Sequence, residues 1–169
     1  MNKITLFAVT AALMVATPAV AAPVAADPPA RGHALILIPL TLSKLQDLYF
    51  GTIIPSASSG TVTVPADGSP ATSAGGVTLI SSIPTFPAHF AGAGSANQLV
   101  FINVTNPGTL DDGAGNIVNV LALTMDGIAL KTIDANRAFE FHVGGVIQVN
   151  ANQPEGLYSS DFLVTAQYL

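Results

Sequence analysis

The chain has 169 residues, of which 50% are hydrophobic and only 9% charged, and its net charge is −5. This length suits one domain with a sizeable core, and the low charge and high apolar content exclude a disordered chain. The acidic balance argues against nucleic acid and anionic membrane surfaces as partners, because both need basic patches. There is no Cys, so the domain cannot depend on a disulfide.

Residues 1–21 have the form of a secretory signal peptide. Lys3 supplies the positive charge, Ile4–Ala16 the apolar stretch, and Ala19-Val20-Ala21 a small-residue cleavage motif. The apolar stretch is shorter than the roughly 20 residues that a membrane-spanning helix needs. We therefore expect cleavage after Ala21, secretion, and no membrane span in the mature chain. Because Lys3 is lost, four basic residues remain against ten acidic ones, which gives a mature net charge of −6.

The mature chain is expected to begin with a flexible tail and to continue as a single domain. Residues 22–33 are rich in Pro, which cannot donate a hydrogen bond to a sheet, so they read as an extended linker. Residues 34–169 form the domain. Its first segment, Ala34–Leu42, is apolar at both odd and even positions, as in a strand that is covered on both faces. Pro39 interrupts this segment and marks an edge strand, a bulge or a switch between sheets.

The rest of the domain repeats short β-prone runs separated by turns rich in Gly, Ser, Pro and Asp. The turn signals recur at about the 8–12-residue spacing of an all-β sandwich or barrel, and no segment after the leader shows a helical period. The run Lys44–Ile54 leads into a tight Gly51, with Ile53 and Ile54 beyond it. Strands are predicted at Gly60–Val64, Val77–Ile83, Phe86–Phe90, Gln98–Thr105, Ile117–Met125, Ile128–Thr132, Phe139–Val143 and Val146–Ala151. Loops or turns are predicted at Ala66–Gly76, Asn106–Asn116, Asp134–Ala138 and Gly144-Gly145.

The last stretch, Gln153–Leu169, has the clearest strand pattern. A turn signal opens it, and Phe162, Val164, Ala166 and Tyr168 then fall on one face while polar residues dominate the other. A period of two indicates a half-buried strand. We predict that this strand contributes to the core, with Phe162, Val164 and Tyr168 buried.

No set of catalytic or metal-binding residues emerges from the sequence. His33, His89 and His142 have no second His or carboxylate at metal-ligand spacing, and no Gly-x-Ser-x-Gly motif positions a Ser nucleophile. The loop at Asp111, Asp112 and Asn116 offers oxygen ligands, but it lacks the residue order of a calcium-binding loop. We therefore expect no enzymatic activity, no cofactor and no metal.

Two groups of motifs carry a family resemblance. The first comprises Pro39-Leu40-Thr41-Leu42, Asp47-Leu48-Tyr49-Phe50-Gly51-Thr52-Ile53 and Gly60-Thr61-Val62-Thr63-Val64. The second comprises Val143-Gly144-Gly145, Val149, Asn152-Gln153, Gly156-Leu157-Tyr158, Phe162-Leu163-Val164-Thr165 and Tyr168. With these motifs, Ala34–Leu169 resembles a family of small secreted proteobacterial domains, the domain of unknown function 4402. That family is in turn similar to the spore-coat-U and chaperone–usher pilin-like domains.

The resemblance implies an immunoglobulin-like β-sandwich of the pilin and adhesin type that lacks one strand. In chaperone–usher pilins a periplasmic chaperone fills the gap, and the N-terminal extension of the next subunit then replaces it. The resemblance therefore implies self-association or other pilus subunits as partners, together with a periplasmic chaperone and an outer-membrane usher. This chain departs from the spore-coat-U pattern in having no Cys. Because the tail is rich in Pro, a donor strand here must come from Ala34–Leu40.

Two interpretations of this segment follow. Either Ala34–Ile38 is donated to a neighbour, or it is the first strand of a self-contained sandwich. The candidate residues of a subunit interface are Ala34, Ile36, Ile38, Leu40, Phe162, Val164 and Tyr168.

The function expected from these features is that of a non-catalytic, secreted structural protein. It would be a pilin-like or surface-coat subunit that assembles by β-strand addition, passes through the periplasm and ends at the cell surface or in an extracellular adhesive fibre. The alternative is a monomeric binding module of the periplasm or cell surface for a glycan or an apolar ligand.

Overall fold

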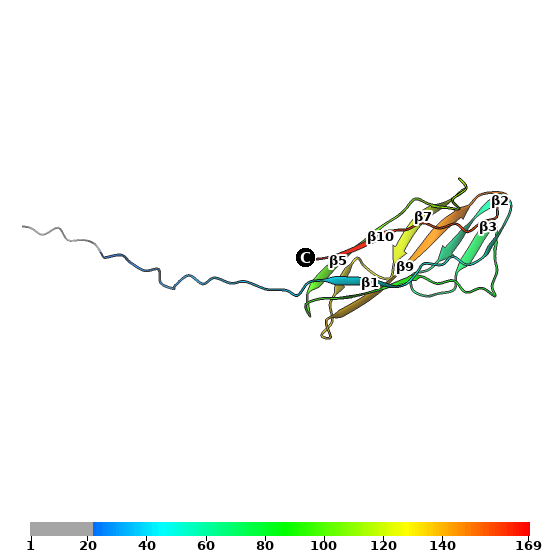
Figure 1. The fold of residues 1–169 in the computed structure, drawn as a ribbon. Helices are drawn as coiled ribbons and strands as arrows, with labels where there is room; N and C mark the ends of the chain where they lie inside the picture. Colours follow the sequence, from blue (N-terminus) through cyan, green and yellow to red (C-terminus); the bar gives the residue numbers. More distant parts are fainter. Residues whose placement is uncertain (1–21) are drawn as a thin grey trace, which may run out of the picture. The chain divides into compact units, whose positions relative to one another are not determined.

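The structure is a computed structural model that describes residues 22–169. The predicted signal peptide, residues 1–21, lies outside the described residues. The chain divides into two units, residues 1–35 and residues 36–169. In the first unit, residues 22–35 form neither strand nor helix, and all their side chains are exposed. The second unit, called the body below, contains every strand that residues 22–169 form (Figure 1).

The body is all-β, and residues 22–169 contain no helix. Its strands are β1 (Thr41–Gln46), β2 (Ile53–Val64), β3 (Thr72–Leu79), β4 (Ala88–Ala93), β5 (Leu99–Thr105), β6 (Thr109–Asp111), β7 (Ile117–Met125), β8 (Leu130–Thr132), β9 (Ala138–Val149) and β10 (Leu163–Tyr168). Within the same residues, nothing helical is long and apolar enough to cross a membrane.

The larger of two antiparallel sheets is built around β9. Its strand order is β1-β4-β9-β2-β3, with β7 also paired to β9 and β6 paired to β7. Val143 pairs with both Ala88 of β4 and Met125 of β7, and Ile147 pairs with both Val62 of β2 and Val120 of β7. β4 and β2 therefore follow one another along one edge of β9, while β7 occupies the opposite edge.

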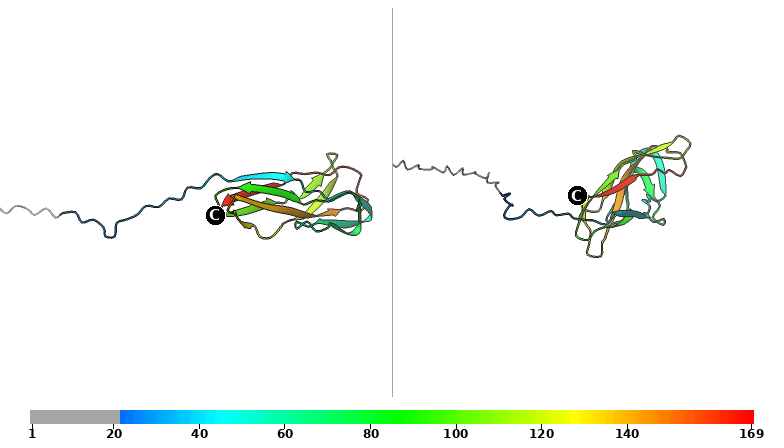
Figure 2. Two further views of the ribbon diagram at one scale, coloured as in Figure 1. Left: turned by 90° about the horizontal axis from the view of Figure 1, so that it is seen from below. Right: turned by 60° about the vertical axis from the view of Figure 1, so that its left-hand side comes forward.

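The smaller sheet has only three strands, in the order β10-β5-β8. β10 pairs with β5 along its whole length, from Leu163 opposite Thr105 to Tyr168 opposite Val100, whereas β8 pairs only with Leu99–Phe101. The two sheets form a sandwich, as Figure 2 shows from two further directions. The predicted all-β sandwich is thus confirmed.

The core consists of two clusters, and the small sheet covers only one of them. The first cluster joins Val100 and Ile102 of β5 to residues of β4 and β9, among them Phe90 and Phe141. The buried members of the second cluster all belong to the larger sheet: Val62, Val77, Val118, Val120, Ile147 and Val149. The inner face of β2, β7 and the second half of β9 therefore has no strand of the small sheet over it.

The strand predicted at Ala34–Leu42 is wrong in position, because β1 begins only at Thr41. Pro39 has no N–H to donate to a sheet and also restricts the backbone of Ile38. Because the segment before β1 pairs with no strand, its apolar side chains are largely exposed: Leu35 is 76% and Ile36 is 90% exposed.

The predicted loop Asn106–Asn116 contains the short strand β6. Two predicted breaks at glycines are also wrong, because strands run through them. β9 continues through Gly144-Gly145, and β3 already begins at Thr72, within the predicted loop Ala66–Gly76. Gly144 and Gly76 lie where another segment of backbone approaches too closely for a side chain. A Cβ atom at Gly144 would overlap the carbonyl oxygen of Val64, and one at Gly76 would overlap that of Ser58. Gly in a strand can mark such a close approach of another backbone as well as a turn.

Candidate functional site

The main cavity of the body is an apolar groove over the second core cluster. Its volume is about 1180 Å³, and residues 47–55 and 153–164 form its rims. Val118, Val120, Ile147 and Val149 of the larger sheet line it from below. The groove exists because the small sheet stops short of these residues, which only irregular segments of chain cover.

Half-buried hydrophobic side chains along both rims show that the covering is incomplete. Phe50, Ile53 and Tyr158 pack against the second cluster, and Phe162 and Val164 pack against the first, yet all five line the groove and stay partly exposed. Burying apolar surface is worth about 25 cal/mol per Å². Any extended apolar segment that filled the groove would gain from this incomplete burial.

Two strand edges border the groove. β1 ends the larger sheet and contributes Leu42 and Lys44 to the lining, while β10 ends the smaller sheet and contributes Leu163 and Val164. In the described part of the chain, each of these strands pairs with a neighbour on one side only. A free strand edge presents unpaired N–H and C=O groups that can pair with another strand. The groove therefore combines an apolar floor with two edges able to accept a strand.

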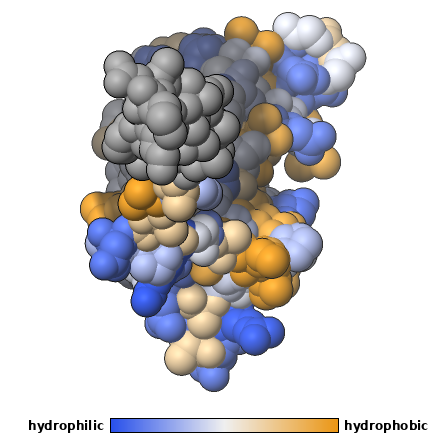
Figure 3. Space-filling view, turned by 90° about the vertical axis from the view of Figure 1, so that its left-hand side faces the viewer, coloured by the Kyte–Doolittle hydropathy of each residue, from blue (hydrophilic) through white to orange (hydrophobic). Residues whose placement is uncertain are grey.

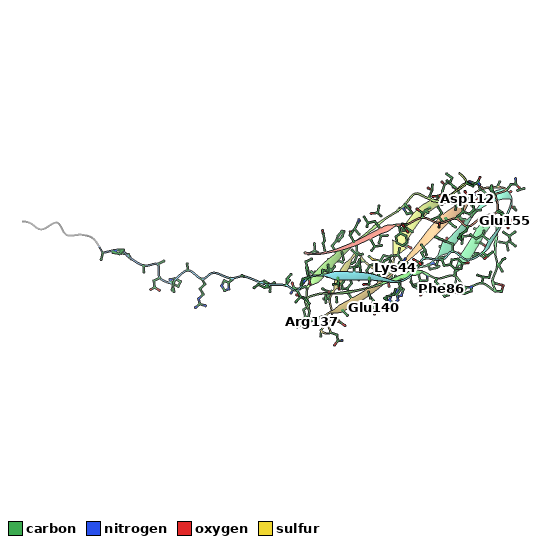
Figure 4. All side chains as sticks on the ribbon, in the orientation of Figure 1. Lys44, Phe86, Asp112, Arg137, Glu140 and Glu155 are labelled. Atoms are coloured by element: carbon green, nitrogen blue, oxygen red, sulfur yellow. The ribbon has the colours of Figure 1, made fainter. Side chains whose placement is uncertain are left out.

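Charged groups lie at both ends of the groove. Near β1, Lys44 forms an ion pair with Asp47, and Asp161 lies close by. The hydrogen bond and charge of Asp47, with a smaller effect of Asp161, raise the pKa of Lys44. At the other end Glu155 lines the groove, and Gly156 lies against the Asp112 side chain. Figure 4 shows Lys44 in the middle of the body, with Glu155 and Asp112 at one extremity.

The Asp112 loop is closed by its own hydrogen bonds. The carboxylate of Asp112 accepts hydrogen bonds from the backbone N–H groups of Ala114 and Asn116 and from the Asn116 side chain, at 2.7–3.0 Å. The hydrogen bond from the Asn116 side chain is the main cause of the lowered pKa of Asp112. Asp111 likewise accepts the N–H of Gly113 at 3.0 Å. Within residues 22–169, no group of three or more His, Asp or Glu side chains is arranged to hold a metal ion.

A set of hydrogen bonds ties the start of the body to its last strand. The N–H of Ile38 donates to Ser95 Oγ at 2.9 Å, and the hydroxyl of Tyr168 donates to the Ile38 carbonyl at 2.9 Å. The same hydroxyl accepts the N–H of Ser95 at 2.7 Å. Both main-chain groups of Ile38 are therefore satisfied by the body itself.

The predicted interface residues separate into two groups. Leu40, Phe162, Val164 and Tyr168 all pack, half-buried, against the first core cluster, and Phe162 and Val164 also line the groove. Phe162, Val164, Ala166 and Tyr168 alternate with exposed neighbours as predicted, but they are half-buried instead of buried, because the groove leaves their face incompletely covered. The other group consists of exposed side chains in the segment before β1: Ala34, Ile36 and Ile38.

Sequence reasoning missed a polar cluster on the outer face of β4 and β9. His89 and His142 lie opposite each other across these strands, with stacked rings 4.3 Å apart. His89 contacts Glu140 at 3.2 Å, and His142 contacts Asp126 at 3.0 Å. The two histidines are far apart in the chain, so only the pairing of their strands brings them together.

Hydrophobic and hydrophilic side chains also lie side by side elsewhere on the surface, as on the face shown in Figure 3. Ile117, Leu121, Ile128 and Leu169, which do not line the groove, are each at least 45% exposed. Scattered apolar residues are ordinary on protein surfaces. The groove differs from them because it is concave and flanked by strand edges.

The comparisons with known proteins agree with the extent of the body. Neither the curated proteins nor the solved structures gave a match. A protein-family model matches residues 40–168, which begin one residue before β1 and end with β10. The chain therefore belongs to the family described as domain of unknown function (DUF4402).

Proposed function

We propose that this protein is a non-catalytic, secreted structural subunit, pilin-like or part of a surface coat, that assembles through β-strand addition. One observation carries the proposal. The body has an apolar groove between two free strand edges, and the chain before β1 is extended, apolar and exposed. In β-strand addition, main-chain hydrogen bonds supply affinity and alternate side chains fill pockets. The groove and the segment have these complementary properties.

The proposal accounts for the unequal sheets. An immunoglobulin-like sandwich with a missing strand would have a small sheet too narrow to cover the larger one, and its inward side chains beside the gap would remain half-exposed. Phe162 and Val164 fit this description. A strand added beside β10 would widen the small sheet and cover the second core cluster. The groove would then be closed in the assembled protein.

The occupant favoured here is the segment before β1 of a second copy. It has an uninterrupted apolar run, Ala34–Ile38, and the side chain of Ile36 is 90% exposed. Its own body loses little packing when Ala34–Ile36 inserts into a neighbour, because Leu35 is 76% and Ile36 is 90% exposed. Before such assembly, a periplasmic chaperone would occupy the groove, and an outer-membrane usher would guide export to the cell surface.

The test is a single charge placed in the segment. Ile36→Asp should abolish assembly of the purified mature protein, measured by sedimentation and by electron microscopy of fibres, because it would bury an unpaired charge in the groove. Val24→Asp is the matched control, since it adds the same charge at a side chain that is 96% exposed and lies outside the apolar run. The control should assemble like the unmodified protein.

Two results would contradict the proposal. One is a mature protein that stays monomeric at high concentration. The other is an Ile36→Asp variant that assembles as well as the Val24→Asp control. In the first case a synthetic peptide of residues 32–38 should also fail to raise the unfolding temperature of the body.

The second candidate function is a monomeric binding module for an apolar ligand. The volume of the groove, about 1180 Å³, is slightly above the range of about 300–1,000 Å³ typical of small-molecule sites. A monomer whose unfolding temperature rises with a small apolar ligand, and not with the peptide, would favour this candidate.

A further inference from the structure

The small sheet has an inner face, toward the first core cluster, and an outer face, toward solvent. Val100 and Ile102 of β5 are buried members of that cluster. Successive side chains of a strand point to opposite faces, so Leu99 and Phe101 point outward, where they are 43% and 38% exposed. A leucine and an aromatic ring therefore lie next to each other on the outer face of β5.

Neighbouring segments extend these two side chains into an apolar patch. Leu130 of β8 pairs with Phe101, and the N–H of Leu169 donates to the Leu99 carbonyl at 3.2 Å. Ile128 comes two residues before Leu130 in the chain, and both Ile128 and Leu169 are more than 70% exposed. A single exposed apolar side chain is ordinary, but a contiguous patch of them marks an interaction site.

The outer face of the small sheet also carries no charged side chain within β5, β8 and β10, which the structure describes throughout. Its outward positions are Leu99, Phe101, Asn103, Thr105, Leu130, Thr132, Leu163, Thr165 and Gln167. The body as a whole is acidic, because residues 36–169 hold nine Asp and Glu residues against three Lys and Arg residues, a net charge of −6. Two copies therefore repel each other least when their uncharged faces meet.

We propose that the outer face of the small sheet is a contact surface between two copies of this chain, which meet face to face about a twofold axis. The contact is isologous, since each copy presents the same patch. Leu99 and Phe101 of one copy are then buried against the patch of the other, while the amides of Asn103 and Gln167 supply polar groups beside it. A basic partner would instead be drawn to the acidic remainder of the surface.

This inference goes beyond the function proposed above and does not depend on it. Strand addition uses the groove and the free edge of β10, and it leaves the outer face of the small sheet exposed. A copy held in a fibre could therefore still meet a copy in another fibre through this face. Many such faces in a row would join two fibres side by side, because each further contact becomes intramolecular.

The size of the face indicates a weak contact. β5 has seven residues, which span about 24 Å, and three strands at a spacing of about 4.8 Å give a width of about 14 Å. The resulting area of roughly 300 Å² is below the value of about 800 Å² per partner in a standard stable interface. We therefore expect a dimer with a dissociation constant on the order of 100 µM.

Sedimentation equilibrium of the mature protein carrying Ile36→Asp measures this contact apart from assembly through the groove. In that background Phe101→Asp should raise the dissociation constant of the dimer at least about tenfold, because it places charge in an apolar contact. Leu121→Asp is the matched control, since Leu121 is an apolar side chain of β7 that is 52% exposed and does not line the groove. The control should leave the dissociation constant within about twofold.

Two further measurements keep a misfolded variant from being mistaken for a lost contact. Phe101→Asp and Phe101→Lys should each be monomeric alone, whereas an equimolar mixture of the two should associate, because opposite charges then face each other. A damaged fold would not be rescued by mixing. Raising the salt concentration should strengthen the dimer of the Ile36→Asp protein with Phe101 unchanged, since salt screens the repulsion between two acidic bodies.

Several results would overturn the inference. They are a protein that stays monomeric up to about 1 mM, equal weakening of the dimer by Phe101→Asp and Leu121→Asp, and a mixture of the two Phe101 variants that does not associate. A monomer that binds a neutral polysaccharide, and loses this binding with Phe101→Asp, would assign the face to a carbohydrate instead. If Ile36→Asp still assembled into fibres, the proposed function would fail, while the comparison of Phe101→Asp with Leu121→Asp would still decide this inference.

Discussion

Among single residues outside the groove, Asp126 contacts two side chains that can carry a positive charge, His142 and Lys131. Its carboxylate contacts His142 Nδ1 at 3.0 Å and Lys131 Nζ at 3.2 Å. Burial raises the pKa of Asp126, but the hydrogen bonds from His142 and Lys131 outweigh burial and hold this pKa below its ordinary value of 3.8. A lowered pKa in the folded state means that the ionised carboxylate stabilises the fold.

Asp126→Asn should therefore destabilise the body in a pH-dependent way. The contribution of Asp126 is fully present at pH values well above 3.8 and is lost as the pH falls through the lower pKa of the folded state. Because the site is partly exposed, we expect a loss of about 1 kcal/mol or less at neutral pH. Urea unfolding at pH 7 and at pH 2–3 measures the difference, which should be smaller at the lower pH.

Glu140→Gln is the control for this prediction. Glu140 also contacts a histidine, His89, but its side chain is 62% exposed, so its removal should change the free energy of unfolding little at either pH. A loss for Asp126→Asn that is equal at both pH values would contradict an electrostatic role of Asp126.

Among the elements, β9 connects most of the larger sheet, since β2, β4 and β7 all pair with it. Its two central glycines allow this. A Cβ atom at Gly144 would overlap backbone atoms of Val64 and Ala66, where β2 ends. A Cβ atom at Gly145 would instead meet the side chains of Leu123 and Phe50, at 3.0 Å and 3.1 Å.

We predict that Gly144→Ala destabilises the body more than Gly145→Ala. Backbone atoms around Gly144 cannot move without disturbing the β2–β9 pairing, so a cost of about 1–3 kcal/mol is expected. Near Gly145 the contacts are with side chains beside the groove, which can shift. Chemical denaturation of the two variants measures both free energies of unfolding, and equal losses would show that the close approach at Gly144 is not decisive.

At the scale of the whole molecule, the folded body begins near Ile38, whose main-chain groups are hydrogen-bonded to it. Residues 22–35 form a unit of their own, while Leu40 packs against the core. At concentrations where the protein is monomeric, a mature chain without residues 22–35 should keep its unfolding temperature within about 1 °C. A chain without residues 22–40 loses the packing of the half-buried Leu40 and both Ile38 hydrogen bonds, about 3 kcal/mol together.

Differential scanning calorimetry of the two truncated chains distinguishes them. The longer truncation should unfold several degrees lower, as a loss of about 3 kcal/mol implies for a domain of this size. If both truncations unfolded at the temperature of the full mature chain, Ile38 and Leu40 would not belong to the folded body.

The strength and the limit of sequence interpretation both appear in β10. The alternation of Phe162, Val164, Ala166 and Tyr168 predicted a half-buried strand, because the side-chain period of a strand is a local property. The same alternation predicted that Phe162, Val164 and Tyr168 are buried, but the structure shows them only half-buried. How much of a face is covered depends on the neighbouring sheet, and no local pattern records the size of that sheet.

Glycine and proline were the residues whose roles depended most on context. Gly144-Gly145 was interpreted as a turn, although it lies in the middle of β9. Pro39 was correctly identified as an interruption, but the strand begins after it and not before. Glycine relaxes the backbone and proline restricts it. Whether either one produces a turn or a close contact depends on what packs against it.

The sequence by itself determined the all-β class and the alternating last strand, because periodicity and turn residues act over a few positions. Only the tertiary structure decided the unequal sheets, the groove over Val118, Val120 and Ile147, the His89–His142 pair and the bonds that hold Ile38. Each of these depends on residues brought together from distant parts of the chain by the order of strands in a sheet. That order is set by the packing of the whole core, which no single stretch of sequence contains.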